Sequence, residues 1–272
     1  MGRRSLREDA LGIARYVATV ATPGGRPPTR PDDLRLQGWY HTIELGDGLV
    51  STGLYDHRPV VGCYGLPASL AGMTALDVGT SDGFWAFELE RRGADRVVAL
   101  DIERFGDFDW LPAIRATLGW RARLRTGARF RLASTMRGSR VERLVCNVYD
   151  LSPATAGVFD LVFCSDVLLH LRDPLRALVN LRSVTGTMAI VGTLAERELE
   201  ERFPDRPWLA LGHADEERSQ GVRLGESCVY WRFSSRALRD ALEYAGFART
   251  EALPPFRLPD GPDITAVVAY TQ

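Results

Sequence analysis

The sequence contains no lysine, so arginine supplies all of its basic charge apart from four histidines. The 34 arginines are balanced by 35 acidic residues, and the formal net charge at pH 7 is −1. No overall field of either sign therefore favours nucleic acid or a membrane surface as a partner. We attribute the absence of lysine to codon usage rather than to function.

Cysteine and long hydrophobic runs are also scarce. The four cysteines form no C-x-x-C pair, and Cys146 and Cys164 lie within apolar runs, which predicts small buried residues rather than reactive thiols. No run of about 18 apolar residues is long enough to span a membrane, and the charged N-terminus does not lead into the apolar core of a signal peptide. We therefore expect a cytoplasmic protein with reduced thiols.

The order of the remaining segments predicts the fold class. Residues 1–21 have the apolar spacing of an amphipathic helix, the glycine- and proline-rich residues 22–33 interrupt it, and short strands and turns follow. We interpret residues 1–70 as an N-terminal cap and residues 71–272 as an α/β domain. Strands alternate with helices there, which predicts a Rossmann-like, seven-stranded, mostly parallel sheet. The expected strands are TALDVG, RVVALDI, VERLVCNV, FDLVFCSD, TMAIVGT, TEALPP and ITAVVAYT.

Two segments are longer than a minimal connection between a strand and a helix requires. They span about residues 103–140 and 195–232. Loops at the carboxyl ends of parallel strands line the ligand crevice of such sheets. We expect the two insertions and the cap to cover a substrate, although either insertion could instead be purely structural.

The stretch LDVGTSDG indicates the cofactor. A dinucleotide fold would carry G-x-G-x-x-G here and leave helix amides free for a pyrophosphate. This turn has Gly79 and Gly83 but places Asp82 beside them, and a carboxylate would repel a phosphate. Asp101 closes the next strand 24 residues after Asp77 (101 − 77), where a carboxylate accepts both ribose hydroxyls. The pattern therefore predicts the cationic cofactor S-adenosylmethionine (SAM), with S-adenosylhomocysteine (SAH) as product.

In the order LDVGTSDG, VALDI, CNVYDL and FDLVFCSDVLLHLRDP, these stretches resemble the motifs of class I SAM-dependent methyltransferases, with Ser81 at the usual middle glycine. The resemblance covers about residues 70–195 well and the last strands loosely. It implies that the glycine turn holds the methionine end, the second strand the ribose and adenine, the third strand the adenine edge, and the fourth strand the sulfonium. The implied cofactor residues are Asp77, Gly79, Thr80, Ser81, Gly83, Asp101, Ile102, Asn147, Val148 and Ser165.

A closer resemblance connects WYHTIELGDGLVSTGLYDHRP and DGFWAFELERRGA with the tRNA wobble-uridine carboxymethyltransferases and their small bacterial relatives. That family uses carboxy-SAM, whose extra carboxylate needs cationic and hydroxyl partners. The chain lacks the family's lysine, has Leu169 in place of its tyrosine, and ends in AVVAYTQ without its arginine. We therefore expect ordinary SAM.

Several side chains are candidates for chemistry on the acceptor. A base near the transferred methyl group accelerates transfer to a hydroxyl or an amine, and histidine suits that role at neutral pH. His170 follows Asp166 by one helical turn, and both can face the cleft, while His41 and His57 lie in the cap. We expect substrate contacts from the aromatic residues Tyr40, Trp85, Trp208 and Tyr230, regard His213 as a surface residue, and find no metal-ligand spacing.

The predicted function is SAM-dependent methylation of a small molecule at oxygen or nitrogen, plausibly in the biosynthesis of a specialised metabolite. Three alternatives stay open: tRNA wobble-uridine (carboxy)methylation, a ring closure on the same fold that releases SAH, and a non-catalytic cofactor-binding subunit. The arginine-rich residues 121–140 could follow a phosphate backbone, but we favour a solvated surface paired with local acids. We expect a small-molecule acceptor and no membrane partner, and the sequence does not determine the oligomeric state.

Overall fold

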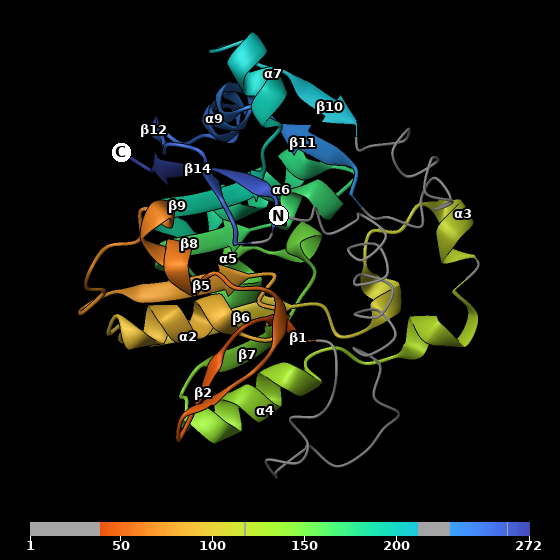
Figure 1. The fold of residues 1–272 in the computed structure, drawn as a ribbon, viewed down its shortest axis with the longest axis vertical. Helices are drawn as coiled ribbons and strands as arrows, with labels where there is room; N and C mark the ends of the chain where they lie inside the picture. Colours follow the sequence, from red (N-terminus) through yellow and green to blue (C-terminus); the bar gives the residue numbers. More distant parts are fainter. Residues whose placement is uncertain (1–38, 117, 212–228, 260) are drawn as a thin grey trace.

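The computed structural model describes residues 39–116, 118–211, 229–259 and 261–272 (Figure 1). The helix expected over residues 1–21, the break at residues 22–33 and His213 lie outside the described residues. No helix in the described ranges is both long and apolar enough to cross a membrane.

The centre of the molecule is one sheet whose strands follow the order β12-β14-β9-β8-β5-β6-β7. β5, β6, β7, β8 and β9 pair in parallel, whereas β14 is antiparallel to both β9 and β12. The predicted seven-stranded, mostly parallel sheet is thus confirmed, and the short β13 pairs additionally with β14. The strands are β5 (Thr74–Val78), β6 (Arg96–Asp101), β7 (Glu142–Val145), β8 (Phe159–Ser165), β9 (Thr185–Leu194), β12 (Arg249–Ala252), β13 (Phe256–Arg257) and β14 (Asp263–Tyr270).

Helices cover the two faces of the sheet because side chains along each strand alternate between the faces. In β8, for example, Phe163 packs with residues of α2 (Phe84–Arg91) and α4 (Ala128–Arg137). Its neighbour Cys164 packs with residues of α6 (Pro174–Ser183) and α9 (Ser235–Tyr244). The small helix α5 (Pro153–Ala156) precedes β8.

The two helices on the second face begin where the sequence supplies a cap. The Asp173 carboxylate accepts the backbone N–H of Arg176 at the start of α6, and Pro174 occupies the first turn. The Ser234 hydroxyl accepts the backbone N–H of Ala237 in the same way. Each cap satisfies an amide that has no partner within its helix.

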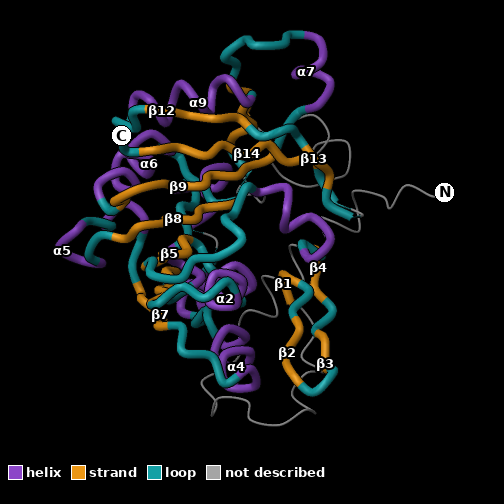
Figure 2. The backbone as a smooth tube through the Cα atoms, turned by 90° about the vertical axis from the view of Figure 1, so that its left-hand side faces the viewer, coloured by secondary structure: helices purple, strands orange, loops and turns teal. Residues whose placement is uncertain are grey.

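The segment before the sheet folds as a small ladder that lies beside α2 and α4 (Figure 2). β1 (Trp39–His41) pairs in parallel with β4 (Gly53–Tyr55), and β2 (Glu44–Gly46) pairs antiparallel with β3 (Leu49–Val50). A 3₁₀ helix, Arg58–Tyr64, leads on to β5. A Cβ atom on Gly53 would lie 2.1 Å from the carbonyl carbon of His41, so the close approach of β1 and β4 requires glycine.

The two expected insertions contain short elements of their own. The second part of residues 103–140 is α4, the ordinary connection that leads to β7, so the added segment is shorter and contains α3 (Pro112–Arg115). Phe105, Trp110 and Leu118 form a small core within it. The second insertion contains α7 (Arg197–Arg202), β10 (Leu209–Leu211) and β11 (Trp231–Phe233), with β10 and β11 antiparallel.

Candidate functional site

The glycine turn between β5 and α2 is held against the end of β6. The backbone N–H of Gly79 donates to the Leu100 carbonyl oxygen at 2.9 Å. Gly79 has φ 79° and Ser81 has φ 53°, so the backbone enters the left-handed region twice within three residues. A Cβ atom on Gly79 would lie 2.3 Å from Cγ2 of Val167, in the loop after β8. Glycine is therefore required where this turn and that loop meet.

The turn is also tied to Asp101, the last residue of β6. The Asp101 carboxylate accepts the backbone N–H of Ser81 at 2.9 Å and that of Ile102 at 2.8 Å, one on each oxygen. Burial raises the pKa of Asp101 to about 6. Each carboxylate oxygen can accept a further hydrogen bond, so the side chain is oriented by the backbone and still able to bind two hydroxyl groups.

Two buried carboxyl groups at the ends of β5 and β8 keep an oxygen without a partner. Among the described residues, Oδ2 of Asp77 and Oδ1 of Asp166 accept no hydrogen bond. Burial raises the pKa of Asp77 to about 7 and also raises that of Asp166. Asp166 has φ 57°, and its other oxygen accepts the Ser165 hydroxyl at 3.1 Å. A buried acceptor without a donor costs about 1–3 kcal/mol, and a ligand with cationic or N–H groups would satisfy both.

Asp82 occupies a different place from the one that its sequence position suggested. Its carboxylate is 1% exposed, and it accepts the backbone N–H groups of Tyr40 at 2.8 Å and His41 at 2.9 Å. Nδ1 of the His41 ring contacts the second carboxylate oxygen. The Asp82 carboxylate, which we expected to repel a phosphate, instead binds residues of β1. The inference of a cationic cofactor from Asp82 was therefore based on a contact that Asp82 does not make.

His57 lies inside an aromatic cluster on the α2 face of the sheet. Its ring centroid is 5.1 Å from that of His41, 5.6 Å from Phe84 and 5.4 Å from Trp85. The side chain is buried, and neither ring nitrogen has a hydrogen-bond partner among the described residues. Burial, with a smaller contribution from His41, holds the pKa of His57 well below its usual range. His57 is therefore a neutral imidazole at physiological pH.

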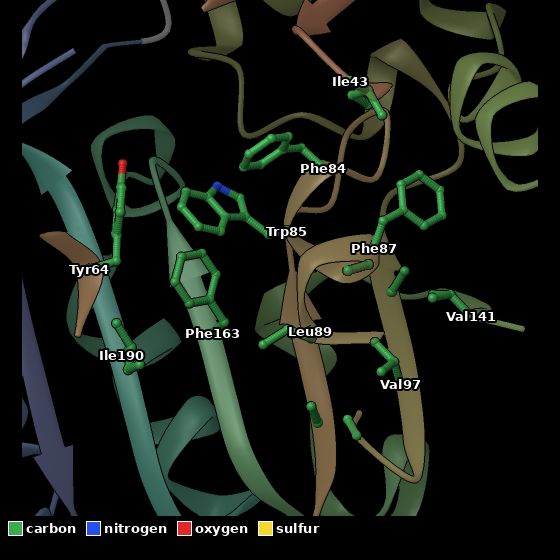
Figure 3. Packing of buried hydrophobic residues seen from close by; sticks show 14 of the residues in the cluster. Ile43, Tyr64, Phe84, Trp85, Phe87, Leu89, Val97, Val141, Phe163 and Ile190 are labelled. Atoms are coloured by element: carbon green, nitrogen blue, oxygen red, sulfur yellow. The ribbon is translucent and has the colours of Figure 1, made fainter. Parts of the chain in front are cut away.

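Tyr64, one of the aromatic residues that the sequence offers for a flat acceptor, joins this cluster to the end of β8. Figure 3 shows the Trp85 indole beside the Tyr64 ring, with Phe163 next to both. A Cβ atom on Gly192, in β9, would lie 2.8 Å from the Ser165 hydroxyl and 3.2 Å from Cε1 of Tyr64. The glycine inside the strand TMAIVGT is the sequence signal for this contact, since glycine within a strand marks a close approach.

The two insertions meet over the turn that contains His170. The Asp109 carboxylate accepts the Tyr149 hydroxyl and the Arg172 guanidinium, each at 2.7 Å. The Tyr230 hydroxyl donates to the Asp109 carbonyl oxygen at 2.8 Å, and its backbone N–H donates to the carbonyl of Leu169 at 2.7 Å. Tyr230 is thus placed beside the loop that follows Asp166.

The remaining site candidates are two residues at the end of β7 and two tryptophans. At the end of β7, Asn147 accepts the backbone N–H of Tyr149 at 3.0 Å, and the neighbouring Val148 is buried. Trp85 is 4% exposed and belongs to the core, while Trp208 lies next to β10 and is bonded to Ser234 at the start of α9. The substrate contacts expected from these two tryptophans stay predictions. Within the described ranges, no group of three or more histidine, cysteine or acidic residues could hold a metal ion.

A family model described as a methyltransferase domain matches residues 64–252. The chain belongs to this methyltransferase domain family. No curated protein sequence matches it. The methyltransferase is similar in fold to the N-terminal domain of EvdMO1, with 19% identity, a TM-score of 0.58, and 100% of this chain and 98% of that one covered. It is also similar to a SAM-dependent methyltransferase from Mesorhizobium loti, with 17% identity, a TM-score of 0.50, and 79% and 97% covered.

The predicted class of enzyme and its cofactor are confirmed: the protein is a SAM-dependent methyltransferase. The residues present fit SAM, because the glycine turn, the oriented Asp101 and the unpaired oxygens of Asp77 and Asp166 offer acceptors for its ribose and ammonium groups. When bound, SAM supplies a methyl carbon activated by its sulfonium. The chain must orient this cofactor, exclude water and manage the proton of the acceptor.

Proposed function

We propose that this methyltransferase transfers the methyl group to an oxygen or nitrogen atom of a small molecule. The observation that carries the proposal is the buried arrangement at the ends of β5 and β8, where polar groups without partners lie next to an aromatic cluster. Asp166 and His57 would face the acceptor there, and Tyr64 would line it. Such a site, mostly aromatic with a few oriented polar groups, is typical of small-molecule pockets.

The proposed roles divide the site between cofactor and acceptor. Asp101 and Ile102 would bind the ribose and adenine, with Asn147 and Val148 along the adenine edge. The residues of the glycine turn and Asp77 would hold the methionine end, and Ser165, Asp166 and His170 would lie beside the reacting atoms. Tyr40 and Tyr230 would approach the acceptor from the cap and from the second insertion. The structural neighbour EvdMO1 was crystallised with SAH and D-fucose, which supports a small acceptor on this architecture.

The observations favour a small molecule over tRNA. Within the arginine-rich residues 121–140, Arg129 is buried and Arg137 donates to the Glu44 carbonyl oxygen and lies over the Phe87 ring. The exposed arginines of the segment are Arg121, Arg123, Arg125, Arg131 and Arg140, and of these Arg125 pairs with Glu103. A nucleic-acid surface needs several free cations in one stripe.

Calorimetric binding of SAM, SAH and carboxy-SAM to the wild type and to Asp101→Ala tests the proposal. We expect micromolar binding of SAM and SAH that is reduced at least about 100-fold in Asp101→Ala, because two hydrogen bonds to a charged group are lost. Asp240→Ala, which removes a partly exposed carboxylate on α9, should bind like the wild type. Preference for carboxy-SAM would favour the tRNA reaction, and cofactor binding without methyl transfer to any acceptor would favour a binding subunit.

A further inference from the structure

We propose that His41 is the general base for a hydroxyl acceptor, that Asp82 is its positioning residue, and that His57 binds a neighbouring hydroxyl of the same acceptor. The inference rests on the proposed function and specifies its substrate class as a polyol. It follows from how three buried side chains of the N-terminal ladder and the glycine turn are hydrogen-bonded, and from which of their atoms lack partners.

Asp82 is itself held in one orientation. The backbone N–H groups of Tyr40 and His41 both donate to its Oδ2 atom, which leaves Oδ1 toward the His41 ring. A carboxylate only accepts hydrogen bonds, so the ring nitrogen facing it, Nδ1, carries the proton. The proton of the neutral ring is then on Nδ1, and Nε2 keeps its lone pair. This is the tautomer that a general base requires.

His41 lies close to the residues that end the central strands. Its ring stacks on that of Phe84, the residue directly after the glycine turn, with the ring centroids 5.4 Å apart. A positive charge on His41 would lower the pKa values of Asp77 and Asp166, at the ends of β5 and β8, against the larger effect of their burial. The pair formed by His41 and Asp82, called the dyad below, therefore lies at the edge of the sheet where the cofactor's methionine end and the acceptor would meet.

His57 provides the second contact. Its two nitrogens are buried without a partner among the described residues, and its ring lies 5.1 Å from that of His41. A neutral imidazole offers one donor and one acceptor and carries no charge to attract an ionic group. Two adjacent hydroxyl groups of a polyol would meet the two rings, one at Nε2 of His41 and the other at His57.

The reaction balances with these groups and SAM. The acceptor O–H bond breaks, and its proton passes to Nε2 of His41. The acceptor oxygen forms a bond to the methyl carbon, and the carbon–sulfur bond breaks with its electron pair retained by sulfur, giving SAH. The Asp82 carboxylate stabilises the imidazolium that forms. His41 then releases the proton to solvent.

Asp82→Asn tests the dyad sharply. The asparagine oxygen would still accept the backbone N–H groups, so its amide would donate to Nδ1 of His41 and move the ring proton to Nε2. ¹H–¹⁵N spectra of histidine-labelled protein report the tautomer directly, and the chain has only four histidines to assign. We expect protonated Nδ1 and free Nε2 in the wild type, the reverse in Asp82→Asn, and no change in Glu44→Gln, an exposed control on β2.

The same spectra, recorded with SAH and millimolar D-fucose or myo-inositol, test the polyol. We expect both polyols to shift His41 and His57, and methyl transfer to either to fall about 10²–10⁴-fold in His41→Gln and Asp82→Asn with unchanged SAH affinity. A wild-type His41 protonated on Nε2, or histidines that respond to neither polyol although SAH binds, would overturn the inference and leave the proposed function intact. Cyclohexylamine, which has an amino group and no hydroxyl group, is the control ligand. Shifts of His41 and His57 with cyclohexylamine but with neither polyol would also overturn the inference. Failure of the wild type to bind SAH would instead remove the proposed function.

Discussion

The two faces of the central sheet are packed in different ways. The face under α6 and α9 is filled largely by valine, leucine and alanine, together with three phenylalanines. The face under α2 and α4 contains two tryptophans, a tyrosine and four phenylalanines, and the N-terminal ladder packs against it (Figures 2 and 3). The aromatic neighbours of His57 lie on the face under α2 and α4 or in the segment that packs against it.

The difference is consistent with the site proposed above, in which the face under α2 and α4 supplies the residues around the acceptor. Aliphatic side chains fill space without polar atoms. Aromatic rings are larger and can carry polar groups, such as the Tyr64 hydroxyl, which is buried beside Ser165. Unsatisfied groups cost stability, and the two nitrogens of His57 and an oxygen of Asp77 gather among the aromatic rings of this face, where a ligand would satisfy them.

Truncation of one large side chain on each face separates these roles and has the largest expected effect. Trp85→Ala should lower the free energy of unfolding by about 3–5 kcal/mol, and Leu178→Ala, in α6, by about 2–5 kcal/mol. In denaturant titrations both should be destabilised. Below the unfolding transition, however, only Trp85→Ala should lose methyl transfer, because Trp85 supports His57. Equal loss of activity in both variants would contradict the comparison.

The next largest effect is expected at the glycine turn between β5 and α2. Gly79→Ala should weaken SAM binding about 10- to 100-fold, because its Cβ would collide with Val167 and displace the turn. Gly72→Ala is a matched control, since Gly72 has φ 81° and a Cβ atom added to it would have no neighbour within 4 Å. Both variants force alanine into a left-handed backbone, which costs about 1–2 kcal/mol in stability. Calorimetry should find weakened SAM binding only in Gly79→Ala.

The affinity for SAM should also depend on pH, because Asp77 and Asp101 are buried carboxyl groups at the proposed cofactor site. The pKa of Asp77 is raised to about 7 and that of Asp101 to about 6, so both groups gain protons as the pH falls from 8 to 5. Loss of their negative charge should weaken SAM binding about tenfold over this range in calorimetric titrations. Because both folded-state pKa values lie above the unfolded value, the contribution of these two groups to the stability of the ligand-free protein should fall as the pH rises from about 4 to 7. A constant SAM affinity from pH 8 to 5 would contradict these roles.

The ion pair between Asp109, in the first insertion, and Arg172, just before α6, should contribute least. Arg172→Ala removes a partly exposed guanidinium from Asp109 and should cost about 1 kcal/mol of stability or less. It should raise KM for the acceptor a few-fold if the insertions form a lid. Arg236→Ala, which breaks an exposed pair within α9, should leave KM unchanged. Equal KM values in the two variants would assign the Asp109 contact to packing alone.

The sequence by itself determined the sheet, its strands and the enzyme class. Alternating apolar strands and helices fix a parallel sheet, and the turn after β5 together with Asp101 marks the cofactor, because backbone conformation and local hydrogen bonds depend on residues close in sequence. The cap at residues 1–70, the lid function of the insertions and the roles of the individual site residues stay predictions.

Only the tertiary structure decided where Asp82 points and what surrounds His57. The His41–Asp82 contact joins residues 41 positions apart, and Gly192 brings Tyr64 to Ser165 from a different strand. Spacing along the chain cannot specify such contacts, because they depend on how the ladder packs against the sheet. The Asp82 carboxylate, which the sequence suggested would repel a phosphate, therefore orients the His41 ring in the folded protein.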